Sequence, residues 1–214
     1  TKTLYRYIEL GLLPVKNLDL PSKVSRNTKK KRVRQHKKVV GTSIEQRPAH
    51  IDKREEFGHW EIDTVLGSRS KGSAVLLTLT ERKTRKEHIL KMHQRTSECV
   101  NLAIQTLKQM YGSLFPSLFK TITADNGSEF SELSKALEAN QAVYYTHPYT
   151  SCERGTNERH NGLIRRFIPK GKSLDDIDEK QIAYVENWCN TLPRKILGYR
   201  SPQKVFLDEL IQIA

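Results

Sequence analysis

Cysteine and long apolar stretches are what this sequence has least of. Its 214 residues include three cysteines, Cys99, Cys152 and Cys189, with no Cys-x-x-Cys pair. An odd number at such wide spacing excludes a disulfide scaffold or a cysteine-based structural zinc site, and indicates reduced thiols. No apolar run reaches the roughly 20 residues of a membrane span, and no hydrophobic stretch follows the basic N-terminus. We therefore expect a cytoplasmic protein with no membrane partner.

Internal repeats are also missing, and low complexity is confined to one basic run. The chain has 8 Tyr, 6 Phe and 2 Trp within a hydrophobic content of 36%, which is enough for a real core and excludes global disorder. A chain of this length fits one ordinary domain with appendages, or at most two small domains.

Positive charge is concentrated in one segment, which we call the basic arm. Residues 23–38 hold nine of the 37 Lys and Arg residues and no acid, in a chain of net charge +13. Such blocks are usually solvated and bind nucleic acid through phosphate contacts that do not read bases. A solubilising tail is the simpler alternative. The DNA contacts predicted in the arm are Lys29, Lys30, Lys31, Arg32, Arg34, Lys37 and Lys38.

Glycine, proline and apolar periodicity divide the rest of the chain. Residues 2–13 predict a short amphipathic helix, and residues 14–54 show no sustained period and are predicted to be a linker. Alternating patterns then predict an antiparallel meander of three strands at 59–67, 73–80 and 87–92. After it we expect strands at 121–124 and 142–146, and helices at 96–110 with Thr96 as its cap, from Phe130 to Leu137, and at 156–167, 178–189 and 202–213.

This order of elements is that of the RNase H-like fold. We expect an α/β protein with a mixed five-stranded sheet flanked by helices, preceded by an N-terminal helical remnant and a basic linker. Right-handed crossovers would make strands 121–124 and 142–146 parallel to the first strand. Ligands gather at the carboxyl ends of such adjacent strands, which is where Asp125 falls.

Three acidic residues stand in distinctive settings. Asp63 lies within the first apolar strand, Asp125 ends the fourth strand, and Glu158 lies in the first turn of a helix that Thr156 is expected to cap. Carboxylates on separate elements can converge to bind Mg²⁺ or Mn²⁺, which prefer oxygen ligands. Two such ions about 3.5–4 Å apart suit phosphodiester cleavage, since they stabilise both the attacking and the leaving oxygen. We predict a two-metal site of this kind.

The residues around Glu158 support this interpretation. Asn157 and Asn161 offer neutral hydrogen-bonding groups, Gly162 leaves room for a phosphate backbone, and Arg165 lies two turns further on, where it could hold a phosphate. Each acidic residue alone has a simpler explanation. A single carboxylate is usually solvated, and Asp-Asn-Gly is a common turn sequence. A carboxylate inside an apolar strand is harder to explain, because it is costly without partners.

Two other groups of residues have alternative interpretations. His147, Cys152 and His160 suggest zinc, but their spacing matches no tight ligand pair. His59 and Trp60, before the first strand, are interpreted as core packing rather than as a stacking platform.

Several stretches resemble the DDE transposases of bacterial insertion sequences, most closely the IS-thirty group. The resemblance covers roughly residues 57–210. The matching stretches are Phe57-Gly58-His59-Trp60-Glu61-Ile62-Asp63-Thr64-Val65, Thr123-Ala124-Asp125-Asn126-Gly127-Ser128-Glu129-Phe130, residues 152–165 around Thr156-Asn157-Glu158-Arg159-His160-Asn161-Gly162, and the tail from Leu192 to Pro202.

The resemblance implies a catalytic core whose metal ligands are Asp63, Asp125 and Glu158. It implies DNA cleavage at transposon ends and then strand transfer into target DNA. It also implies homo-oligomers on DNA and a place in the bacterial cytoplasm, associated with the nucleoid. Two alternatives stay open: a noncatalytic DNA-binding remnant of a mobile element, and an RNase H-fold structure-specific nuclease.

Three parts of the chain are expected on this basis. Residues 1–20 are predicted to be the remnant of a helix-turn-helix region that the family places before the core. Residues 21–54 are the basic linker, and residues 55–214 are the RNase H-like catalytic core.

Overall fold

The computed structural model describes residues 2–16, 19, 40–68, 72–147 and 155–213, and it divides the chain into two compact units, Thr1–His36 and Lys37–Ala214. The first unit contains the amphipathic helix α1 (Lys2–Glu9). This helix is shorter than predicted, because Gly11 adopts a φ of +70° and Pro14 follows. The remaining elements belong to the second unit.

A mixed five-stranded sheet forms the centre of the second unit. Its strand order is β3-β2-β1-β4-β5. The first three strands form the predicted antiparallel meander, and β4 and β5 run parallel to β1. This confirms the RNase H-like topology. The strands are β1 (His59–Leu66), β2 (Val75–Glu81), β3 (Glu87–Met92), β4 (Thr121–Ala124) and β5 (Ala142–Tyr145).

Helices follow the strands as the periodicity predicts, and two of them have side-chain caps, of which the sequence analysis predicted the one at Thr96. Thr96 accepts a hydrogen bond from the Cys99 amide, and Asp178 accepts one from the Gln181 amide. The helix expected from Thr156 begins at Gly155 in the described part of the chain. The α-helices are α3 (Ser97–Tyr111), α4 (Phe115–Leu118), α5 (Gly155–Ile164), α6 (Glu179–Thr191) and α7 (Pro202–Ile213).

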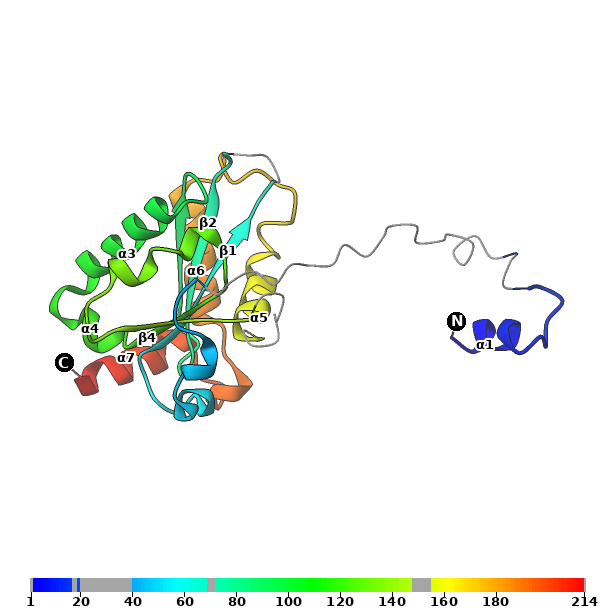
Figure 1. Ribbon diagram of the computed structural model, residues 1–214, viewed down its shortest axis with the longest axis horizontal. Coiled ribbons are helices and arrows are strands. Elements are labelled where there is room, and N and C mark those ends of the chain that lie inside the picture. Colours follow the sequence, from blue (N-terminus) through cyan, green and yellow to red (C-terminus); the bar gives the residue numbers. More distant parts are fainter. Residues whose placement is uncertain (1, 17–18, 20–39, 69–71, 148–154, 214) are drawn as a thin grey trace. The chain divides into compact units, whose positions relative to one another are not determined.

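The sheet separates two hydrophobic clusters, with α3 and α5 on opposite sides (Figure 1). On the α3 side, Trp60 is fully buried and stacks on Phe119 at a centroid distance of 4.4 Å. This confirms the packing role predicted for Trp60. On the other side, Val65 packs with residues of α5 and α6. Alternate residues of β1 therefore face different helical layers.

The segment after Asp125 differs from its prediction. In place of one α-helix there are two short 3₁₀ helices, Ser128–Phe130 and Leu133–Ala136. Phe130 and Leu133 are fully buried. Their spacing of three residues fits a 3₁₀ turn as well as an α-helix, so the pattern identified the buried side chains but not the helix type.

Residues 40–54 pack against the sheet, although the sequence predicts a linker there. The 3₁₀ helices Ile44–Gln46 and Ala49–Lys53 both lie in this segment. The Tyr145 amide donates to the Thr42 carbonyl at 2.9 Å, and Arg47 donates to Thr123 Oγ1 at 2.9 Å. The compact unit thus includes the end of the expected linker.

Two further findings concern the thiols and the helices. Cys99 and Cys189 are buried and free, whereas Cys152 lies outside the described residues. No helix in the described part of the chain combines the length and the apolar character needed to cross a bilayer.

Candidate active site

Asp63, on β1, and Asp125, directly after β4, lie at matching positions of two adjacent parallel strands. The last paired residues of β1 and β4 are Glu61 and Thr123. Asp63 lies two positions after Glu61, and Asp125 lies two positions after Thr123. The two aspartates therefore occupy equivalent positions along neighbouring chains that are about 4.8 Å apart in a sheet. Because side chains alternate along a strand, both aspartates point to the same face of the sheet as Val65. Helix α5 covers this face. The structure therefore brings together two of the three predicted carboxylates.

The Asp63 carboxylate is held through both of its oxygens. Oδ1 accepts a hydrogen bond from the Thr64 amide at 2.9 Å. Oδ2 accepts one from Asn161 Nδ2 at 2.8 Å, across 98 residues of sequence. These two donors fix the orientation of the carboxylate.

The loop after β4 holds Asp125 in place. Asp125 Oδ1 accepts a hydrogen bond from the Gly127 amide at 2.8 Å. Between them, Asn126 donates to the Thr146 carbonyl at 2.6 Å and accepts from the Val40 amide at 3.1 Å. The turn is thus tied to β5 on one side and to the segment entering the core on the other.

Glu129 is a further acidic residue of this site, and the sequence did not single it out. Its side chain is 1% exposed and pairs with Arg95, whose Nε lies 2.6 Å from Oε1. Thr64 Oγ1 donates to the same oxygen at 3.1 Å. A Cβ on Gly127 would lie 2.5 Å from Glu129 Oε2 and 2.8 Å from Asp125 Oδ1. The two carboxylates therefore flank Gly127. The only feature of the sequence that could have pointed to Glu129 is its position four residues after Asp125.

Helix α5 is attached to β1 at two points. The Asn157 amide donates to Glu61 Oε2 at 3.4 Å, and Asn161 donates to Asp63. The backbone of Glu158, the third predicted carboxylate, lies between these points in the first turn of α5. Leu163 and Ile164 anchor the end of the helix in the core. The helix bearing Glu158 is therefore held beside the strand bearing Asp63.

Glu61 is fully buried, and its charge is compensated by Arg82. Arg82 Nη1 lies 2.6 Å from Glu61 Oε1, and both side chains are at most 3% exposed. Burial lowers the pKa of Arg82, and the neighbouring Glu61 opposes that shift. The pair supplies a charged acceptor for α5 without leaving an uncompensated charge in the interior.

Two of the predicted DNA contacts have other partners in the structure. Asn157 is 1% exposed, which does not suit a direct DNA contact. Arg165 follows the last residue of α5, and its Nη2 donates to the Leu66 carbonyl at 2.6 Å. Burial lowers the pKa of Arg165. The prediction placed Arg165 on the helix. In the structure it lies on the turn that follows the helix.

The remaining candidates are separated or lie outside the described residues. The seven basic-arm residues predicted to contact DNA fall outside, as does Cys152. His147 contacts Glu45 at 3.2 Å, and His160 contacts Glu87 at 2.7 Å. These separate partners give the zinc alternative no support.

Residues 53–152 match the family model described as the integrase core domain. The probable transposase for insertion-like sequence element IS1161 of Streptococcus salivarius is 45% identical over 214 residues, which is 100% of this chain and 60% of that protein. The transposase for IS4351 of Bacteroides fragilis is 41% identical over 167 residues, which cover 76% of this chain and 48% of that protein. This chain therefore spans about half to three fifths of these two relatives.

Two further comparisons agree with these. The transposase InsI for IS30C of Escherichia coli is 36% identical over 168 residues, covering 78% of this chain and 42% of that protein. Among solved structures, the catalytic core domain of BIV integrase superposes with a TM-score of 0.53 at 16% identity, covering 73% of this chain and 98% of that one. The latter comparison shows the fold.

Proposed function

We propose that this chain is a transposase of the IS30 type, which cleaves DNA at transposon ends and joins the freed ends to target DNA in a metal-dependent reaction. The position of Asp63 and Asp125 is the observation that carries the proposal. Asp63 in β1 and Asp125 just after β4 each lie two residues beyond the last pair between these parallel strands, on one face of the sheet. Helix α5, which bears Glu158, is attached beside them through Asn161.

These residues have the donor chemistry that a divalent metal requires. The integrase core family depends on divalent metals. Asp63 and Asp125 offer hard oxygen ligands, and hydrogen bonds from Asn161 and Gly127 orient one oxygen of each. We propose Asp63, Asp125 and Glu158 as the ligands of Mg²⁺ or Mn²⁺. When bound, two such ions stabilise the attacking and leaving oxygens of an in-line displacement.

Two displacements at phosphorus make up the proposed reaction. In the first, a water oxygen forms a bond to phosphorus, the bond from phosphorus to the 3′ oxygen breaks, and a free 3′-hydroxyl results. In the second, that hydroxyl attacks a phosphodiester of target DNA, so that one phosphorus–oxygen bond forms as another breaks. The number of phosphodiester bonds is conserved in the joining step, so it needs no energy-supplying cosubstrate.

DNA contacts are proposed for two parts of the chain. Asn161 of α5 contacts Asp63, and Arg165, just after α5, contacts the Leu66 carbonyl at the end of β1. The backbone of a bound strand would pass over these two side chains. The basic arm at residues 23–38 would add nonspecific phosphate contacts. We also propose that residues 1–20 derive from a DNA-recognition region, that the part of 21–54 preceding the packed segment 40–54 links it to the core, and that the protein acts as a homo-oligomer on DNA.

A strand-transfer assay tests the proposal. The chain is incubated with Mn²⁺, a target plasmid and a duplex that carries the element's terminal repeat and a pre-cleaved 3′-hydroxyl. The wild type is compared with Asp125→Asn, whose fold is checked by circular dichroism and thermal melting. We expect joined product from the wild type only.

The other outcomes discriminate among the functions. Joined product from Asp125→Asn would refute the assignment of Asp125 as a required ligand. Binding of the duplex with no product from the wild type would favour a noncatalytic DNA-binding protein. Metal-dependent cleavage of an RNA–DNA hybrid or a branched duplex, without joining, would favour the structure-specific nuclease.

A further inference from the structure

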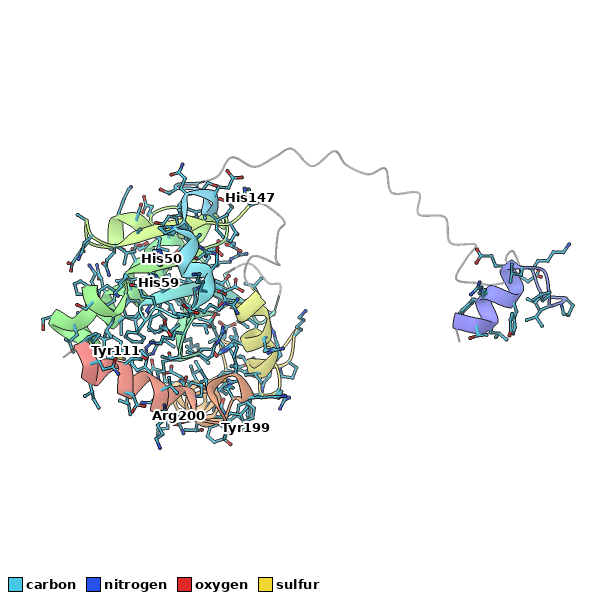
Figure 2. All side chains as sticks on the ribbon, turned by 90° about the horizontal axis from the view of Figure 1, so that it is seen from below. His50, His59, Tyr111, His147, Tyr199 and Arg200 are labelled. Carbon is cyan, nitrogen blue, oxygen red and sulfur yellow. The ribbon has the colours of Figure 1, made fainter. Side chains whose placement is uncertain are left out.

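A second group of metal-binding side chains lies at the opposite end of β1 from Asp63. It consists of His50 in the 3₁₀ helix Ala49–Lys53, Glu56 in the following loop, and His59, the first residue of β1. One ligand atom from each lies within 4.8 Å of the others. Figure 2 shows His50 and His59 side by side, apart from His147. His59 precedes Asp63 by four strand positions, which correspond to about 13 Å.

The distances within this group suit a small ion. Glu56 Oε2 lies 3.2 Å from His50 Nε2 and 3.3 Å from His59 Nε2. Nitrogen and oxygen ligands placed about 2.0–2.1 Å from a zinc ion in a tetrahedron are about 3.3–3.4 Å apart. Both contacts have the length of an edge of that tetrahedron.

An unsatisfied buried nitrogen is the independent observation. His59 is 3% exposed, and its Nε2 has no hydrogen-bond partner among the described residues, although Glu56 Oε2 is close. The contact thus has the length of a hydrogen bond without its geometry. A buried ring nitrogen without a partner is costly, and a cation held between it and the carboxylate would remove that cost.

The surroundings orient both ligands. His59 Nδ1 lies 2.8 Å from Thr121 Oγ1. In the tautomer in which Nδ1–H donates to this hydroxyl, the Nε2 lone pair faces Glu56, which is the arrangement typical of metal-binding histidines. Lys120 Nζ donates to Glu56 Oε1 at 2.8 Å, which leaves Oε2 for the two histidines.

We propose that His50, Glu56 and His59 bind one first-row transition-metal ion, Zn²⁺ being the best match. Two imidazoles with one carboxylate select such ions over Mg²⁺, which prefers an all-oxygen site. The ion would join the segment that enters the core to the first strand of the sheet. It is separate from the proposed catalytic metals and does not depend on the proposed function.

Zinc binding by the metal-stripped, tag-free chain tests this inference, with Co²⁺ absorption as a second readout. The test variant is His50→Ala, because the His50 side chain is 57% exposed and its removal leaves the core intact. The matched control is His147→Ala, since His147 also contacts a carboxylate, Glu45, and is 38% exposed. Asp63→Asn combined with Asp125→Asn removes the carboxylates of the other site.

The expected result is one Zn²⁺ per chain for the wild type, for His147→Ala and for the double aspartate variant. His50→Ala should weaken zinc binding by at least about tenfold, and Thr121→Val by about 10–100-fold through loss of the ring orientation. Two outcomes overturn the inference: no stoichiometric zinc binding by the wild type, or zinc binding that His50→Ala leaves unchanged while the double aspartate variant loses it.

Discussion

Asn161 of α5 donates a 2.8 Å hydrogen bond to Asp63 of β1 and thereby joins a helix and a strand 98 residues apart in sequence. The bond both orients the carboxylate and fixes the helix that bears Glu158. Asn161 is therefore a positioning residue for the proposed reaction, acting through the two residues it connects.

Asn161→Ala should reduce strand transfer by about 10–100-fold, the range seen when a residue that orients a metal ligand is removed. The fold should persist, because Leu163 and Ile164 still anchor α5. The assay is joined-product formation at several Mn²⁺ concentrations, with Asn140→Ala as an exposed control. If high Mn²⁺ fully restored the rate, the role of Asn161 would be confined to metal affinity. A rate equal to that of the wild type at every concentration would contradict the prediction.

Arg95→Ala should destabilise the fold by about 1–3 kcal/mol, since it leaves the buried Glu129 carboxylate without its charged partner. Urea unfolding measures the change. Adding Glu129→Gln to that variant should recover part of the loss, because a neutral amide costs less to bury than an unpaired charge. An equal or larger loss in the double variant would show that the ion pair is not the source of the effect.

Gly127→Ala should abolish most activity and also lower stability, because the buried Glu129 carboxylate that pairs with Arg95 must shift. The backbone of Gly127 is extended, at φ −68°, so the backbone itself tolerates alanine there. Its Cβ, however, would lie 2.5 Å from Glu129 Oε2 and 2.8 Å from Asp125 Oδ1, so one or both carboxylates must move. We expect at least a tenfold lower rate of joining, roughly 1.4 kcal/mol in the barrier. Thermal melting and the joining assay on the same preparation separate the two effects.

Gly162→Ala, unlike Gly127→Ala, should cause no steric clash within the protein. Gly162 lies within α5, and none of the described atoms is within 4 Å of where its Cβ would be. Alanine should therefore stabilise the helix by up to about 1 kcal/mol. If DNA passes over this face, as proposed, the same methyl group should weaken DNA binding, measurable by fluorescence anisotropy. Stabilisation without any change in DNA binding would place the DNA elsewhere.

Glu186 should make stability fall with acid. Burial raises its pKa, but the hydrogen bond and charge of His88, the Ile89 amide and Lys86 outweigh burial and hold the pKa below its usual value of 4.5. Because the folded-state pKa is lowered, this contribution is complete above pH 4.5 and is lost as pH falls through the folded value. Glu186→Gln should cost about 1–2 kcal/mol at pH 7 and progressively less in acid. Urea midpoints across pH test this, with the exposed Glu55→Gln as control.

Sequence patterns were sufficient for the sheet and for two of the three proposed ligands. The alternating pattern of β1 predicted that Asp63 and Ile62 point to opposite faces of the sheet. The short apolar run that ends at Ala124 predicted that Asp125 lies at the end of a strand. Both follow from local periodicity, which a strand expresses in consecutive residues. The five strands accordingly lie within two residues of their predicted bounds.

Contacts between distant segments could not be predicted in this way. Glu129 belongs to the site because Thr64, 65 residues away, donates to it. His59 is unsatisfied at Nε2 because Thr121, 62 residues away, occupies its other nitrogen. Such pairings depend on strand register and loop geometry, which no single stretch of sequence contains. For that reason His59 was interpreted only as packing.

The two-sided packing of the sheet sets the limits of any usable fragment. Residues 53–152, the part that matches the integrase core model, include all five strands but end before α5, α6 and α7. A protein cut there would expose Val65, Leu76 and Ile89, which those later segments cover, and would lack Phe206 against Phe57 and Trp60. An uncovered apolar sheet face promotes aggregation. A soluble expression fragment must therefore extend through α7, well beyond the end of the matched family model at residue 152.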